Sequence, residues 1–281
     1  HDSAACLLKD GIVLGACEEE RFTGIKHDYS FPKNTISWLY ERFNIKKDDI
    51  TQVAFYDNPK KKLNRIKWST LRGGIFYYFK RKEIIERNQQ FVYDIESDIK
   101  KYTNDKVKIH YSDHHLSHAA YSFYTSPFKE AVILSVDGVG EWETTTLYHG
   151  KNNELKKLDK IKFPSSLGML YSTMTAFLGF KPNEGEYKVM GLAPYGDGKV
   201  YFTELLSIFE NSTNKFTIDQ KYFTWEYSDK IMFNRKLCKL LNLVPRLPEE
   251  EITQDHKNLA ASLQKLYEYQ FLRLVRTAKN I

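Results

Sequence analysis

The stretch Ala131-Val132-Ile133-Leu134-Ser135-Val136-Asp137-Gly138-Val139-Gly140 decides the fold class of this sequence. Its first six residues form a continuous apolar run, which predicts a strand buried on both faces. The run ends at an Asp followed by a glycine-containing turn, and two further strand-like segments follow at 144–148 and 155–163. A helical pattern at 166–178 comes next. Strands followed by a helix in this way predict an α/β protein.

The first part of the chain shows a related pattern. Segments 3–8 and 12–17 flank the turn signal Lys9-Asp10-Gly11, which predicts a β-hairpin. Further elements are expected as helices at 36–43, 60–105, 115–124 and 259–274, and as strands at 52–56 and 107–111. Two successive units of strands and helix predict a duplicated architecture. The first copy lacks its opening strand, and the second copy lacks its later strands. We therefore interpret the chain as part of a longer protein, truncated at both ends.

The composition is typical of a folded protein, and its excess of positive charge is concentrated in one segment. With 281 residues, 42% of them hydrophobic and 15% aromatic, the chain can bury a substantial core. The net charge is +6, but residues 60–87 alone hold ten Lys and Arg against two Glu. Basic and aromatic residues interleave there, which fits an RNA or anionic-membrane surface and also a plain helical insertion with Lys and Arg at its surface. We prefer the insertion, so neither nucleic acid nor membrane is an expected partner.

The cysteines and the apolar runs bear on location. The three cysteines Cys6, Cys17 and Cys238 are widely spaced and form no CxxC pair. This spacing favours neither a disulfide framework nor a thiolate zinc site, and it fits a reducing compartment. The sequence shows no apolar stretch of about 18 residues and no signal peptide at its start. We therefore expect a cytoplasmic protein.

The densest candidate site is Asp113-His114-His115-Leu116-Ser117-His118, at a strand-to-helix junction. A spacing of four residues places His114 and His118 on one face of a helix, where both imidazoles can bind one metal ion. Glu is absent from the place that it takes in HExxH hydrolases. The alternative is that one histidine caps the helix and the others are solvated. His115 points elsewhere and is expected to be a bystander.

Asp137 closes the apolar strand and is the second candidate. A carboxylate at the end of a buried strand is costly unless it is paired or bound to metal. Together with His114 and His118 it forms a set of two histidines and one carboxylate, which suits ferrous iron. The following turn, Gly138-Val139-Gly140, offers N–H groups that can approach an anion. The alternative is an ordinary Asp-Gly turn into a hairpin.

Two further segments carry candidate residues. In Gly185-Glu186-Tyr187-Lys188, and on to Gly196, charge and glycine alternate without an amphipathic period, which favours a ligand-binding loop over a surface turn. At the start of the chain, His1 and Asp2 precede small residues that allow a close approach of a ligand. His1 is a candidate general base, and a structural histidine at a strand end is the alternative.

Taken together, these motifs resemble the NodU/CmcH-type O-carbamoyltransferases, and the resemblance spans the whole chain. The segments that carry it are His1-Asp2-Ser3-Ala4-Ala5, Glu18-Glu19-Glu20-Arg21-Phe22-Thr23, Lys26-His27-Asp28, Phe31-Pro32, His114-His115-Leu116-Ser117-His118-Ala119-Ala120, Val136-Asp137-Gly138-Val139-Gly140-Glu141-Trp142, the run from Gly185 to Gly196, and Ala260-Ala261-Ser262-Leu263-Gln264. Several long motifs in matching order are far more specific than one.

The resemblance implies a duplicated actin-like, sugar-kinase and Hsp70 (ASKHA) fold, related to the tRNA threonylcarbamoyl-transfer proteins. Its first lobe would comprise residues 1–127, with a helical insertion at about 60–105, and an incomplete second lobe would comprise 128–281. A YrdC-like domain would follow in the full-length protein and make carbamoyl-adenylate from carbamoyl phosphate and ATP. The present domain would then pass the carbamoyl group to a hydroxyl of a small molecule or sugar. A homodimer is left open.

The resemblance also implies roles for individual residues. The family's metal, Fe²⁺ in most cases with Zn²⁺ or another divalent ion as alternatives, is held by the HxxxH pair and two aspartates. His114, His118 and Asp137 match three of these ligands, and the fourth would lie beyond residue 281. The turn Gly138 to Gly140 would hold phosphate, and the Gly185-Glu186 pair would contact the nucleotide, with Glu186 accepting ribose hydroxyls.

The remaining roles leave alternatives open. Lys188 would either pair with phosphate or face outward, and His1 would act as the base with the assistance of Asp2. A sugar kinase or ATPase of the same fold would instead hold Mg²⁺ through carboxylates, which the histidine pair argues against. A module that binds nucleotide or acceptor without catalysis is the other alternative.

Overall fold

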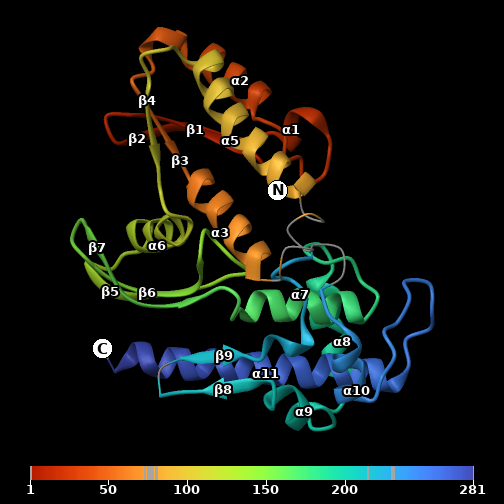
Figure 1. The fold of residues 1–281 in the computed structure, drawn as a ribbon. Helices are drawn as coiled ribbons and strands as arrows, with labels where there is room; N and C mark the ends of the chain where they lie inside the picture. The colour runs from red at the N-terminus through yellow and green to blue at the C-terminus, as the bar shows by residue number, and fades with distance from the viewer. Residues whose placement is uncertain are drawn as a thin grey trace. The chain divides into compact units, whose positions relative to one another are not determined.

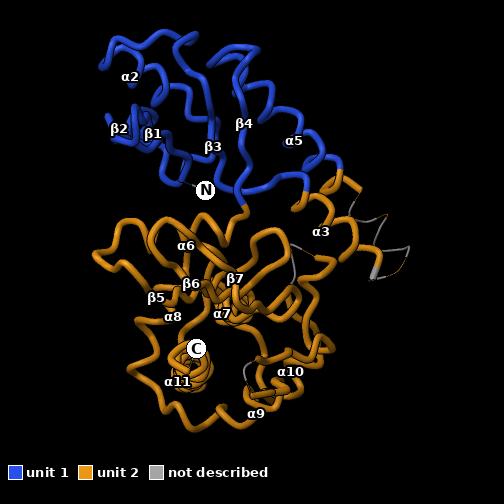
Figure 2. Tube along the Cα trace, turned by 90° about the vertical axis from the view of Figure 1, so that its left-hand side faces the viewer, with its two compact units in different colours: residues 1–60, 86–112 blue, residues 61–85, 113–281 orange. Residues whose placement is uncertain are grey.

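The computed structural model describes residues 2–72, 74, 79, 82–213, 215–228 and 232–280. The chain forms two compact units, shown in Figure 2: residues 1–60 with 86–112, and residues 61–85 with 113–281. The helical segment expected at 60–105 contributes to both units. The lobe limits inferred from the resemblance, and the duplicated actin-like fold itself, stay predictions.

The first unit opens with the predicted hairpin of β1 (Ala4–Lys9) and β2 (Ile12–Glu18). Asp10 and Gly11 form its two-residue loop with φ of 53° and 79°, as a turn that matches the twist of two antiparallel strands requires. Helices α1 (Glu20–Thr23) and α2 (Lys33–Phe43) follow, and α2 packs on the hairpin. A Cβ on Gly15 would lie 2.8 Å from the Phe43 ring, so glycine permits this contact.

A parallel strand pair completes the first unit. After the short 3-10 helix η1 (Lys47–Asp49), β3 (Gln52–Phe55) pairs with β4 (Lys108–Tyr111), and α5 (Lys82–Tyr102) connects toward β4. Buried side chains of α5 and of the segment before β4 form the core here, namely Ile95, Ile99 and Val107. The predicted strand at 52–56 and the predicted hairpin are thus confirmed.

The second unit is built around the strands that the sequence predicted from residue 131 onward. Strands β5 (Glu130–Val136), β6 (Glu143–Lys151) and β7 (Glu154–Lys162) form an antiparallel sheet in the order β5-β6-β7. Helices α6 (His114–Tyr124) and α11 (Gln254–Lys279) lie on opposite sides of this sheet (Figure 1). Because side chains alternate along a strand, Ile133 packs toward α6 and Leu134 packs into the core on the other side.

The remaining elements, apart from α3, contribute side chains to a larger core, which also contains side chains of α11. In chain order they are α3 (Pro59–Arg72), α7 (Leu167–Phe177), α8 (Glu186–Leu192), η2 (Ala193–Tyr195), α9 (Phe202–Leu206), β8 (Phe209–Asn211), β9 (Phe216–Ile218), η3 (Gln220–Tyr222) and α10 (Arg235–Leu241). The β8–β9 hairpin was not predicted, because strands of three residues are too short to show alternation. Among the residues that the structure describes, none of the helices has the length and apolar character needed to cross a membrane.

Candidate metal centre

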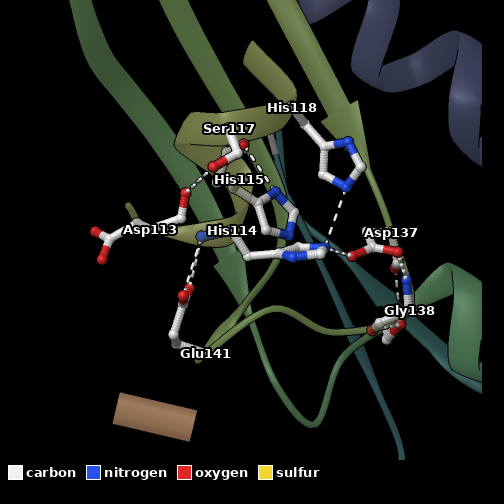
Figure 3. Close-up of polar contacts among 10 residues, drawn as sticks. Asp113, His114, His115, Ser117, His118, Asp137, Gly138 and Glu141 are labelled. Carbon is white, nitrogen blue, oxygen red and sulfur yellow. Dashed lines mark hydrogen bonds and ion pairs between the residues drawn. The ribbon is translucent and has the colours of Figure 1, made fainter. Parts of the chain in front are cut away.

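Helix α6 presents the two predicted histidines from its first and second turns. Their separation by four residues stacks the imidazoles on one helix face, as expected. The two Nε2 atoms lie 3.1 Å apart, with the rings nearly perpendicular (Figure 3). The hydrophobic face of the same helix, with Ala119 and Phe123 buried, packs on the sheet and fixes which side the histidines occupy.

Asp137 reaches this histidine pair from the end of β5. Its Oδ2 lies 2.9 Å from His114 Nε2, and the Gly138 N–H donates to its Oδ1 over 2.6 Å. The three candidate ligand atoms, one each from His114, His118 and Asp137, lie within 4.8 Å of one another. The packing of α6 on β5 therefore brings together residues that are 23 positions apart in sequence.

The spacing of these atoms fits a shared divalent cation. Ligands about 2.1 Å from one metal ion sit about 3.0 Å apart in octahedral and about 3.4 Å apart in tetrahedral coordination. The separations of 3.1 and 2.9 Å are closer to the octahedral value. Partial desolvation and the neighbouring His114 lower the pKa of His118, although part of its side chain is exposed. Burial raises the pKa of Asp137, but hydrogen bonds from His114 and Gly138 outweigh it and set that pKa to about 2. A neutral imidazole and an ionised carboxylate are the forms that bind metal.

The glycine-containing turn after Asp137 lies where the sequence predicted it, and the N–H groups of Gly138 and Gly140 have partners within the protein. Gly138 donates to Asp137, and the Gly140 N–H donates to the Glu143 carbonyl over 2.9 Å. The Gly138 carbonyl accepts from the Ser166 hydroxyl over 2.6 Å, at the start of α7. Phosphate binding by Gly138, Val139 and Gly140 stays a prediction.

The Gly185-Glu186 pair and Lys188 lie at the beginning of α8. Glu186 Oε1 accepts from the Ser172 hydroxyl of α7 over 2.6 Å and from the Asn183 N–H over 2.8 Å. The exposed Lys188 ammonium lies 5.9 Å from the centres of the Phe180 and Tyr187 rings. The carboxylate is thus anchored to the protein, and the lysine is exposed. A contact of Glu186 with ribose and one of Lys188 with phosphate stay predictions.

Asp2, the predicted assistant of the base, belongs to the other unit. His1 lies outside the described residues. Asp2 is exposed, and its Oδ1 lies 2.7 Å from Nδ1 of His27. The Glu20 carboxylate accepts from the His27 N–H over 3.0 Å, so these three side chains form a second group of polar ligand atoms.

A comparison with known protein families assigns the chain. All residues from 1 to 281 match the family described as Carbamoyltransferase N-terminus. The chain belongs to this family. The match agrees with the resemblance drawn from the motifs, which is thereby confirmed.

Curated relatives of this carbamoyltransferase N-terminal domain are longer than the chain. An uncharacterized protein of Synechocystis sp. is 38% identical over 290 residues, which cover 99% of this chain and 46% of that protein. Nodulation protein NolNO of Sinorhizobium fredii is 31% identical over 287 residues, which cover 100% of this chain and 39% of the relative. Nodulation protein NolO of Bradyrhizobium diazoefficiens is 28% identical over 56% of the chain and 26% of its own length. The chain therefore spans about half or less of these relatives.

Two polar residues around the candidate metal ligands of the carbamoyltransferase domain were not identified from the sequence. Glu141, only 2% exposed, accepts from the His114 N–H with both carboxylate oxygens, over 3.0 and 3.1 Å. Lys61 of α3 lies 2.6 Å from Asp113, the residue before the first histidine. His115 is buried between helix and sheet, where its Nδ1 contacts Thr146 Oγ1 at 3.0 Å. No sequence periodicity signals such contacts, because they join segments distant along the chain.

Proposed function

We propose that this chain is the carbamoyl-transferring domain of an O-carbamoyltransferase with a duplicated actin-like fold. In this proposal it takes a carbamoyl group from carbamoyl-adenylate, made from carbamoyl phosphate and ATP, and delivers it to a hydroxyl of a small molecule or sugar. The observation that carries the proposal is the convergence of His114, His118 and Asp137 in a chain of this family. A YrdC-like domain of the intact protein would make the adenylate.

The reaction sets clear requirements for the site. The acceptor oxygen forms a bond to the carbamoyl carbon, and the bond from that carbon to the adenylate phosphate oxygen breaks. AMP leaves with the electron pair of that bond, and the hydroxyl proton passes to a base, for which we propose His1 with the assistance of Asp2. A bound divalent metal, which His114, His118 and Asp137 would hold, supplies Lewis acidity near the developing negative charge.

Helix α7 offers a physical basis for adenylate binding. Its N-cap Ser166 bonds to Gly138, next to the metal-ligand candidate Asp137, and Ser172 on the same helix bonds to Glu186. The proposed phosphate-binding turn and the proposed ribose contact are therefore both hydrogen-bonded to the same helix, which supports their acting on one ligand.

Product analysis on the intact protein tests the proposed reaction. The protein would be incubated with carbamoyl phosphate, ATP and a panel of hydroxyl acceptors, and the products measured by mass spectrometry. We expect a carbamoylated acceptor together with AMP. A phosphorylated acceptor without a carbamoyl adduct would instead identify a kinase of the same fold, and no turnover of any acceptor would favour a binding module.

The metal assignment has its own test. We expect elemental analysis to find iron or zinc in the unaltered intact protein. His118→Ala removes one of the two imidazoles, so we expect this variant to lose that metal. His110→Ala changes an exposed histidine of β4 in the other unit and serves as the control. Equal metal content in all three proteins would refute His118 as a ligand.

A further inference from the structure

We propose that Glu141 is a positioning residue of the metal centre, which sets the distance between the histidines of α6 and Asp137. This inference rests on the proposed metal site and adds a residue to which no role has been given. Glu141 does not contribute to the group of candidate ligand atoms formed by His114, His118 and Asp137. Its carboxylate acts instead through the backbone of the helix that carries both imidazoles.

The contact is specific and buried. Both Glu141 oxygens lie within hydrogen-bond distance of the His114 N–H, at 3.0 and 3.1 Å, and the residue is 2% exposed. Asp113 is the N-cap residue of α6, but its side chain does not accept a hydrogen bond from the N–H groups of the first helical turn. The N-terminus of a helix has unsatisfied N–H groups and a partial positive charge, which a carboxylate stabilises. Glu141 therefore supplies from another segment the cap that Asp113 does not.

The segment that carries Glu141 also carries Asp137. The two residues belong to the short connection between β5 and β6, which is closed by the Asp137 N–H to Thr144 carbonyl bond and the Gly140 N–H to Glu143 carbonyl bond, both 2.9 Å. A Cβ on Gly140 would lie 3.0 Å from the His114 Cβ, so this connection lies directly against the first turn of α6. One hydrogen-bonded turn thus holds one candidate ligand at one end and contacts the helix of the other two candidate ligands at its other end (Figure 3).

This arrangement predicts how metal affinity depends on Glu141. Without the carboxylate, the first turn of α6 can shift relative to Asp137, and the separation of 2.9 Å between His114 Nε2 and Asp137 Oδ2 is no longer fixed. Removing a residue that orients metal ligands typically costs about 10- to 100-fold in metal affinity. We expect a loss in this range for Glu141→Ala, and a smaller loss for Glu141→Asp, whose shorter side chain reaches less far.

Glu19 provides a matched control in the other unit. Its fully buried carboxylate also bonds to the start of a helix from another segment, accepting from the Asn34 and Thr35 N–H groups of α2 over 3.1 and 3.0 Å. Glu19→Ala therefore removes a comparable buried helix cap, and Glu19→Asp shortens the side chain that forms it. Both pairs of substitutions should lower stability, but only the Glu141 pair should weaken metal binding.

The experiment measures iron or zinc affinity of the intact protein by competition with a chelator, for the unaltered protein and all four variants. It also records ¹⁵N NMR signals of the His114 imidazole in the metal-free protein. We expect weaker metal binding and shifted His114 signals in Glu141→Asp, and in Glu141→Ala if that variant folds. Unchanged affinity and unchanged His114 signals in Glu141→Asp would overturn the inference. If the unaltered protein binds no metal, and the His114 signals still shift in Glu141→Asp, the metal site would be refuted. The positioning of His114 by Glu141 would then still stand.

Discussion

Asp137 shows how competing interactions set the charge of a single side chain. Burial alone would favour the protonated carboxyl and raise its pKa. Hydrogen bonds from His114 and Gly138, and the electrostatic effect of the neighbouring His114, favour the carboxylate and bring the pKa to about 2. The folded protein therefore stabilises the ionised form, which is also the form that a metal ion requires.

The lowered pKa of Asp137 makes stability depend on pH. Because the folded pKa of about 2 lies below the ordinary value of about 3.9, the contribution is fully present above about pH 4 and is lost as the pH falls toward 2. The side chain is one-third exposed, so we expect about 1 kcal/mol after solvent screening. In the metal-free protein, Asp137→Asn should be less stable by this amount at pH 6. Urea unfolding between pH 6 and 3 should show the difference shrinking, and a constant difference would contradict the assignment.

At the scale of secondary-structure elements, α7 packs against the turn after β5 that carries Asp137. Ser166 caps α7 by accepting from the Met169 N–H over 3.0 Å and donates to the Gly138 carbonyl. Gly168 lies so close to the turn that a Cβ there would be 2.7 Å from the Gly138 Cα. The absence of a side chain at position 168 is therefore what lets the helix approach the Asp137 turn.

Gly168→Ala should separate these two elements. Its methyl group would meet backbone atoms, which cannot rotate away, so we expect a loss of about 1–3 kcal/mol in the free energy of unfolding. Gly191→Ala in α8 is the matched control, because a Cβ there meets no atom within 4 Å. Alanine should be neutral in that helix or stabilise it by up to about 1 kcal/mol. Equal effects of the two substitutions in urea unfolding would argue against the close approach.

At the scale of the whole molecule, the two units differ in the size of their cores. Within residues 61–85 and 113–281, one large hydrophobic cluster contains side chains of helices α7, α8, α9, α10 and α11 and of strands β7, β8 and β9. The first unit buries a smaller cluster around Ile95 and Ile99. Helix α11 contacts β5, α7, α8, α9 and η2. It therefore ties the sheet that carries Asp137 to the helices that carry Glu186 and its anchor.

Substitutions along α11 should separate core from surface effects. Leu263 is 1% exposed, and Leu263→Ala should cost about 2–5 kcal/mol because it leaves a cavity in the large cluster. Leu272 on the same helix is 49% exposed, and Leu272→Ala should change stability by less than about 0.5 kcal/mol. Chemical unfolding of both variants checks the contrast. A similar small cost at both positions would mean that α11 is not part of the main core.

Much of the fold and part of the site follow from the amino-acid sequence by itself. Alternation and apolar runs predicted β1, β2, β5, β6 and β7, and the four-residue spacing of His114 and His118 predicted a shared helix face. These are local properties, because a side chain's direction depends on the repeat of its own strand or helix. The family also followed from the motifs, since its residues stand in order along the chain.

Only the tertiary structure decided which residues surround the metal-ligand candidates. Asp137 meets His114 because α6 packs on β5, and Glu141 meets the His114 N–H because the β5–β6 turn lies against that helix. His115, expected to be a bystander, lies outside the group of candidate ligands, and the structure adds that it is buried and contacts Thr146 of the sheet. Such contacts depend on how whole elements pack, and the spacing of residues along one element does not encode that packing.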